Sequence, residues 1–99
     1  VAFLNNKINE VDILQSKKFK KDYKKLSHEI RKKFSKALIY LGKDLSIKTL
    51  NFKPLKSYNT IYRFRVGLNF RATIKRSYSD EPWLLLRIGP HKLIDKFPI

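Results

Sequence analysis

Apolar and cationic residues alternate along the C-terminal half of this chain. From residue 61 to 66 and again from 70 to 78, aromatic or aliphatic residues return at every second position except at Arg76, and 83–89 is a third apolar run. Successive strand residues point to opposite faces of a sheet, so these runs predict three strands. The segments between them, 67–69 and 79–82, are short enough to be turns, which predicts an antiparallel meander.

The alternation predicts a sheet with two different faces. We expect one apolar face, formed by Tyr62, Phe64, Val66, Phe70, Ala72, Ile74, Leu84, Leu86 and Ile88. The opposite face is expected to be basic and to carry Arg63, Arg65, Arg71, Thr73, Lys75 and Arg87. Because three strands agree in this pattern, it is more specific than the pattern of any one of them.

The N-terminal half predicts one strand and two helices. Residues 10–16 read as a short strand, and Ser16 can cap a helix whose apolar stripe is Phe19, Tyr23 and Leu26. Ser27 can cap a second helix, which we expect to end at Gly42 and to carry the stripe Ile30, Phe34, Ala37, Leu38 and Leu41. The two helices form a hairpin able to cover the apolar face of the sheet.

Two segments show no sustained period. Residues 44–60 are expected to form an ordered connection that contains a short strand or a turn of helix. Residues 1–9 are expected to be an N-terminal extension of uncertain structure. A chain of 99 residues is most simply one domain, spanning 1–99.

Charge points to a polyanionic partner. Lysine and arginine outnumber aspartate and glutamate by 23 to 8, a formal net charge of +15. Such self-repulsion is usually tolerated because a polyanion is bound, so RNA, DNA or an acidic protein is expected. No apolar run is long enough to span a membrane, and we expect no membrane partner. The absence of cysteine and of a signal-peptide pattern at the N-terminus favours the cytoplasm.

The residues with candidate chemistry lie in the C-terminal half. Arg63, Arg65 and Arg71 are placed to converge on one phosphodiester, because cross-strand neighbours on one face lie close together. His91 follows the last strand, and histidine is the side chain most readily poised for proton transfer near neutral pH. The only other histidine, His28, is interpreted as structural, and with no cysteine and no clustered carboxylates we expect neither metal nor cofactor.

Several segments together resemble the RelE/ParE superfamily of bacterial toxin–antitoxin toxins. The most specific are Ile61-Tyr-Arg-Phe-Arg-Val-Gly67, Asn69-Phe-Arg-Ala72 and Ile88-Gly-Pro-His91, accompanied by Lys53-Pro-Leu-Lys56 and by the lysine-rich helix 19–26. The resemblance covers roughly residues 10–97. It implies an α+β fold of order β-α-α-β-β-β, with a small, curved, antiparallel-dominated sheet packed on a helical hairpin.

The resemblance, which is strongest to RelE and YafQ, also implies an activity. Such members cut mRNA in the ribosomal A site without a metal: the 2′-hydroxyl attacks the adjacent phosphate and leaves a 2′,3′-cyclic phosphate. It implies His91, Arg71 and Arg63 as catalytic residues. The residues expected to bind RNA are Arg65, Lys56, Lys53, Lys75, Arg87, Lys92 and Phe97. An acidic antitoxin is the implied protein partner.

Some alternatives remain open at this point. A ParE-like inhibitor of DNA gyrase, or a non-catalytic member that binds RNA or antitoxin, would have the same fold. Phe97 lies near the position of a C-terminal aromatic residue, often tyrosine, but has no hydroxyl to transfer a proton. Phe97 and Trp83 can each stack on a base or fill the core.

Overall fold

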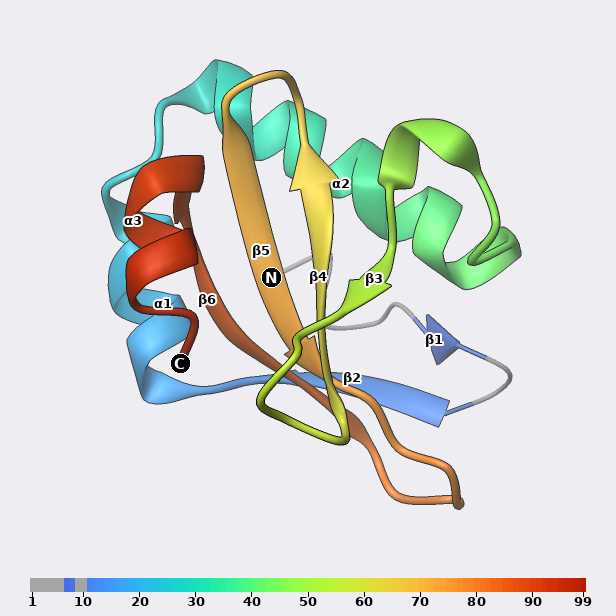
Figure 1. Ribbon diagram of the computed structural model, residues 1–99. Coiled ribbons are helices and arrows are strands. Elements are labelled where there is room, and N and C mark those ends of the chain that lie inside the picture. The colour runs from blue at the N-terminus through green and yellow to red at the C-terminus, as the bar shows by residue number, and fades with distance from the viewer. Residues whose placement is uncertain (1–6, 9–10) are drawn as a thin grey trace.

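The computed structural model describes residues 7–8 and 11–99, and it contains one mixed sheet with helices on both faces (Figure 1). The strand order is β1-β2-β6-β5-β4-β3; β2 and β6 are parallel and all other pairs are antiparallel. The elements are β1 (Lys7–Ile8), β2 (Val11–Gln15), α1 (Lys17–Lys24), α2 (His28–Lys43), η2 (Lys48–Leu50), β3 (Lys53–Pro54), β4 (Ile61–Val66), β5 (Phe70–Lys75), β6 (Trp83–Pro90) and α3 (His91–Lys96).

The expected α+β fold of order β-α-α-β-β-β is confirmed, with β1, η2, β3 and α3 as additions. Of the N-terminal extension, residues 1–6 and 9 lie outside the described residues, and Lys7–Ile8 pairs with β2. The connection 44–60 holds both a 3-10 turn and a short strand. None of the helices in the described part of the chain combines the length and the apolar character that crossing a bilayer requires.

Serine caps start both long helices. The Ser16 hydroxyl accepts a hydrogen bond from the Phe19 N–H at 3.0 Å, and the Ser27 hydroxyl accepts one from Ile30 at 3.3 Å. Helix α2 continues one residue past Gly42, where we expected it to end. Its C-terminal cap is Asp44, whose N–H donates to the Tyr40 carbonyl while its backbone is already extended, so no left-handed glycine is needed.

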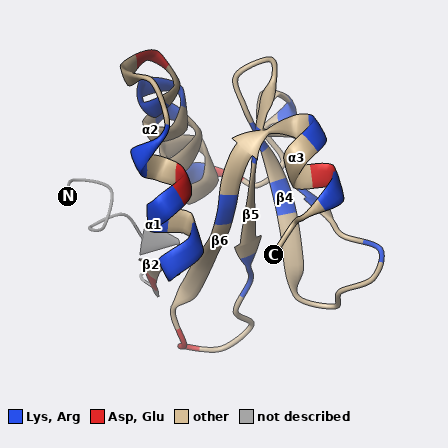
Figure 2. Ribbon diagram, turned by 90° about the vertical axis from the view of Figure 1, so that its left-hand side faces the viewer, with Lys and Arg blue, Asp and Glu red and all other residues tan. Residues whose placement is uncertain are grey.

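The helical hairpin covers one face of the sheet and forms a dry core there (Figure 2). The rings of Phe19 and Phe34 lie 5.4 Å apart, and Phe34 lies 6.4 Å from Phe64 of β4, so aromatic contacts link both helices to the sheet. All three rings are fully buried. The apolar stripes predicted from the sequence therefore face the strands predicted to receive them.

The predicted alternation fails along β6. Leu84 and Leu86 are only half-buried, whereas Trp83, Leu85 and Ile88 lie in the core. A register shift explains this: Thr73 pairs with Arg87 but the next residue, Ile74, pairs with Leu85, so Leu86 is an extra residue. A bulge of this kind reverses the alternation on either side of it, and it also decides that Trp83 fills the core.

Strand β5 ends at Lys75 rather than at residue 78. The Arg76 N–H turns to the Thr60 carbonyl at 2.7 Å. Beyond it, Ser77 and Ser79 hydrogen-bond within their own loop, because short hydroxyl side chains compete with strand pairing.

The second face of the sheet is covered in part by α3 and the C-terminal residues (Figure 2). Ile94 of α3 is buried, and the Thr73 hydroxyl, also buried, donates to the Pro98 carbonyl at 2.6 Å. Thr73, expected on an open basic face, is thus covered. The arginines on either side of it remain partly accessible.

Candidate functional site

The arginines of the β4–β5 hairpin lie together. Arg65 is paired directly with Arg71 across the two strands, and Arg63 lies two residues away on the same face. Partial burial, and then the positive charges of Arg65 and Arg63, lower the pKa of Arg71 from its ordinary value. The three guanidiniums therefore share one electrostatic site, as the sequence predicted.

The hairpin turn orients part of this cluster. The Nη1 of Arg71 donates to the carbonyls of Leu68 at 3.3 Å and Phe70 at 2.8 Å, which holds the guanidinium beside the turn. The buried Nε of Arg65 has no hydrogen-bond partner among the described residues. Gly67 adopts φ of 68°, and a Cβ there would lie 2.7 Å from Lys33 Cδ, so the turn needs glycine. The buried Nε of Arg65 carries a desolvation cost that a hydrogen-bond acceptor on a ligand would offset.

His91 lies at the same end of the sheet. It is the first residue of α3, and its N–H donates to the Asn69 carbonyl in the β4–β5 turn at 2.8 Å. Arg71 pairs with Gly89, two residues before His91, and Gly89 is buried beneath Leu93 of α3. The imidazole is about two-fifths exposed, so a substrate can reach it.

Asp95 is a member of the cluster that the sequence analysis missed. Its Oδ1 accepts from Arg63 Nη1 at 2.7 Å, and its Oδ2 lies 3.9 Å from His91 Nδ1. Its charge opposes the effect of the arginines and offsets part of the lowering of the Arg71 pKa. His91 and Asp95 are four residues apart, the spacing of neighbours on one helix face, but α3 has only six residues and its apolar pair, Leu93 and Ile94, shows no helical period.

Strand β3 brings further basic residues to the cluster. Lys53 pairs with Arg63, and both line a cavity of about 420 Å³ together with Lys56, Asp95, Pro54, Leu55, Ile94 and Pro98. The lysines predicted from the 53–56 segment therefore join Arg63 at one opening.

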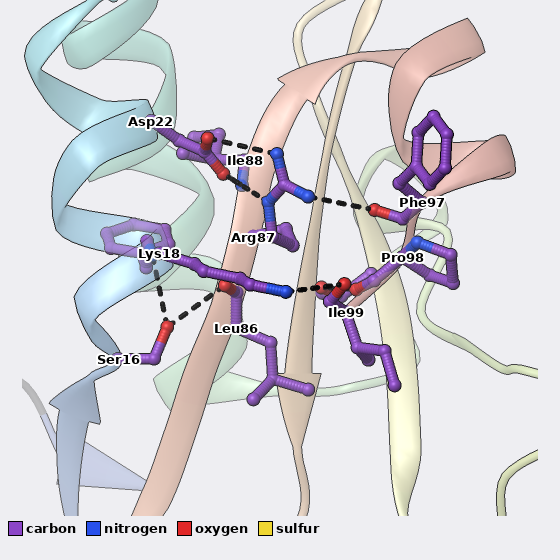
Figure 3. A network of polar contacts seen from close by, with 11 residues as sticks. Ser16, Lys18, Asp22, Leu86, Arg87, Ile88, Phe97, Pro98 and Ile99 are labelled. Carbon is purple, nitrogen blue, oxygen red and sulfur yellow. Dashed lines mark hydrogen bonds and ion pairs between the residues drawn. The ribbon is translucent and has the colours of Figure 1, made fainter.

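The structure places Arg87 apart from this cluster. Its Nε and Nη2 donate to the two carboxylate oxygens of Asp22 at 2.7 and 3.1 Å, and Nη1 donates to the Phe97 carbonyl at 3.4 Å (Figure 3). The Asp22 hydrogen bonds raise the pKa of Arg87, outweighing its burial. Asp22 also accepts from the Ile88 N–H, so this group joins α1, β6 and the C-terminus.

The remaining predicted residues lie at the surface. Lys92 is exposed on α3, and Lys75 is exposed at the far end of β5, paired with Ile61. The Phe97 side chain is half exposed, with Lys96 Nζ 5.6 Å from its ring centre, so it does not fill the core. No group of three or more His, Cys, Asp or Glu side chains able to hold a metal ion occurs among residues 7–8 and 11–99.

Comparison with known proteins gives matches among solved structures. No protein-family model and no curated protein matches this sequence. The structure of the RelB–RelE antitoxin–toxin complex from Methanococcus jannaschii contains a chain that is 33% identical, with a TM-score of 0.67; the match covers 86% of this chain and 99% of that one.

Two structures from E. coli have the same fold. In the DinJ–YafQ complex the identity is 22% and the TM-score 0.64, with 86% of this chain and 98% of that chain covered. YafQ alone gives 21% and 0.62 over the same shares. Because the aligned part is 33% identical to the Methanococcus jannaschii chain and covers 99% of that chain, this chain belongs to the family of RelE-like toxins.

Proposed function

We propose that this chain is the toxin of a type II toxin–antitoxin system and that it cleaves mRNA as a metal-independent endoribonuclease, with the ribosome presenting the mRNA. The observation that carries this proposal is the gathering of Arg63, Arg65 and Arg71 at the end of the sheet where His91 begins α3. Guanidinium groups bind phosphate oxygens through paired hydrogen bonds, and an imidazole beside the phosphate can take a proton.

In the proposed reaction, His91 takes the proton of a ribose 2′-hydroxyl. The 2′-oxygen attacks the adjacent phosphorus, the bond to the 5′-oxygen breaks, and that oxygen takes up a proton from water. The products are a 2′,3′-cyclic phosphate and a 5′-hydroxyl. Arg71 and Arg63 stabilise the charge that develops on the phosphorane oxygens, while Arg65 and Lys56 orient the RNA backbone.

Asp95 has a role of its own in this scheme. In the free protein its Oδ1 accepts a hydrogen bond from Arg63 at 2.7 Å, while its Oδ2 lies 3.9 Å from His91 Nδ1, too far for a hydrogen bond. A phosphate that binds Arg63 must compete with this carboxylate. Asp95 therefore lowers the affinity of the site for RNA while it orients Arg63.

The proposed protein partner is an acidic antitoxin segment. Three kinds of observation support it: the net charge of +15, the scarcity of carboxylates near the arginine cluster, and the presence of RelB and DinJ in the solved structures of similar chains. Opposite charge would speed association and exclude uncharged competitors.

The test is to incubate the purified protein with translating ribosomes and a labelled mRNA. We expect cleavage products ending in a 2′,3′-cyclic phosphate, strongly reduced for His91→Ala. The matched control is His28→Ala, since His28 is exposed at the start of α2 and far from the proposed site in sequence. Intact mRNA together with inhibited supercoiling by DNA gyrase would overturn the proposal in favour of a ParE-like activity.

A further inference from the structure

A second group of cationic and aromatic residues lies outside the proposed active site. The Arg76 guanidinium lies 4.9 Å from the ring centre of Tyr78, 5.3 Å from Tyr62 and 5.5 Å from Trp83. Tyr62 in turn stacks on Phe52, with ring centres 4.5 Å apart and planes only 8° from parallel. We refer to these five residues as the aromatic platform.

The platform extends from a buried residue, Trp83, to an exposed one, Tyr78. Trp83 is buried in the core, whereas Tyr78 is 66% exposed. The hydroxyls of Tyr62 and Tyr78 share a hydrogen bond of 2.9 Å, which lowers the pKa of Tyr62 and raises that of Tyr78. The exposed ring is therefore held by a cation and by a hydrogen bond, and it presents a flat apolar surface to solvent.

Arg76 has no carboxylate to neutralise it. In the part of the chain that the structure describes, it forms no ion pair, and its buried Nε has no hydrogen-bond partner. The acids of the same loop, Asp80 and Glu81, are exposed and would repel a phosphate there. A nucleobase, which is neutral and has a π-face, suits this surface better than a phosphate does.

The platform and the arginine cluster lie on opposite faces of the sheet. Tyr62 and Arg76 share the face of Phe64, which packs on the helices, whereas Arg63 and Arg71 lie on the other face. Strand β3 is the edge of the sheet between the two faces, and its Lys53, with Lys56 just beyond it, is exposed. An RNA that contacts both sites therefore passes around this basic edge.

We propose that Tyr78, held in place by Arg76 and Tyr62, stacks on a base of the same single-stranded RNA whose phosphate occupies the arginine cluster, a few nucleotides from the scissile bond. This inference rests on the proposed function, since it takes RNA as the ligand. It adds a contact that makes binding depend on the length of the RNA.

The experiment measures binding of 2′-O-methyl oligoribonucleotides, which resist 2′-hydroxyl attack, at two to ten nucleotides. Fluorescence anisotropy gives the affinity, and Trp83, the only tryptophan, reports on ligands at the platform. We expect affinity to rise once the oligonucleotide reaches the platform. Tyr78→Ala should lose about tenfold for the long oligonucleotides and nothing for the dinucleotide, because stacking on an aromatic ring contributes about 1–3 kcal/mol per base.

Two further variants separate stacking from a loss of shape. Tyr78→Phe keeps the ring and should bind long RNA nearly as well as the unaltered protein, whereas Tyr78→Leu, apolar but without a ring, should bind as weakly as Tyr78→Ala. Ile39→Ala is the matched control, since Ile39 is 51% exposed on α2 and belongs to neither site. Equal affinities of Tyr78→Ala and the unaltered protein at every length would overturn the inference.

Failure of the proposed function would look different. In that case the ribosome assay would leave mRNA intact, while the length-dependent binding and its loss in Tyr78→Ala would still be measurable. Loss of affinity by Tyr78→Ala equally at all lengths, the dinucleotide included, would show that the residue acts on the fold and would refute the stacking contact.

Discussion

Arg87 and Arg71 lie on neighbouring strands of one sheet, and their surroundings give them opposite properties. Arg87 makes two hydrogen bonds to Asp22, which raise its pKa, and it joins three parts of the chain. Arg71 is partly buried and lies near other arginines, and both effects lower its pKa. The comparison shows that Arg87 is committed to a carboxylate within the fold, whereas Arg71 forms no ion pair among the described residues and is proposed to bind an anion.

The excess of basic over acidic residues explains why some arginines have a carboxylate partner and others do not. With 23 basic and 8 acidic residues, most cations have no carboxylate to pair with. Lysines on helix surfaces are solvated and mobile, so they add charge without defining a site. The arginines of β4 and β5 are held by a paired strand register, so there the excess charge has a fixed arrangement.

The largest effect should come from replacing Arg71, the arginine proposed to bind phosphate. Arg71→Gln should lower mRNA cleavage by about 100- to 1,000-fold, the loss typical of one donor to a developing oxyanion. Stability should stay the same or rise slightly, because repulsion from Arg65 and Arg63 disappears. The ribosome assay and urea unfolding measure the two quantities. Full cleavage by the variant would mean that Arg71 takes no part in the chemistry; Lys32→Gln, exposed on α2, is the control.

Removing Asp22, the carboxylate partner of Arg87, should affect folding instead. Asp22→Ala should lower the free energy of unfolding by about 3 kcal/mol, since it leaves a mostly buried guanidinium without its carboxylate. Urea unfolding followed by circular dichroism gives the value. The control is Asp12→Ala, because Asp12 is exposed on β2. If both variants unfold at the same urea concentration, the pair does not have the structural role assigned to it.

An intermediate case is Arg63, which has a carboxylate partner at a site proposed to bind RNA. Asp95→Asn should tighten binding of a short 2′-O-methyl oligonucleotide by roughly threefold, because the pair is exposed and contributes little. Cleavage should not rise in proportion, since Arg63 loses its charged hydrogen-bond partner. Weaker binding by Asp95→Asn would indicate that its carboxylate supports the site more than it competes for it.

The smallest effect concerns the salt dependence of binding. If Arg65 contacts one phosphate, Arg65→Gln should reduce the slope of log affinity against log salt by about 0.7, the value for one contact to a single strand. Arg87→Gln, compared under conditions where it is folded, should leave that slope unchanged because Arg87 is committed to Asp22. Equal reductions in both variants would erase the distinction between the two arginines.

Much of the proposed site follows from local pattern. The alternation over 61–75 places Arg63, Arg65 and Arg71 on one face because a short turn fixes the register between adjacent strands. The serine caps at Ser16 and Ser27 are equally local. These features depend on residues close in sequence, so they can be read without knowing what lies across the fold.

The errors in the prediction arise where contacts are distant. The bulge at Leu86 depends on how β6 meets β5, and α3 has too few residues and too little period to be recognised by itself. Short helices owe their stability to packing, here of Ile94 against the sheet, rather than to their own sequence. Asp95 could not be placed beside Arg63 without that helix.

The sequence by itself determined the family, the order of the main elements and the two faces of the hairpin, and its charge predicts a polyanionic partner. The tertiary structure alone decided which cations have partners, because Asp22 and Arg87 are 65 residues apart and Arg63 and Asp95 are 32 apart. It also decided that Arg76 meets three aromatic rings at one end of β5. Electrostatic and stacking contacts act through space over a few ångströms, and only the folded chain brings such residues within that range.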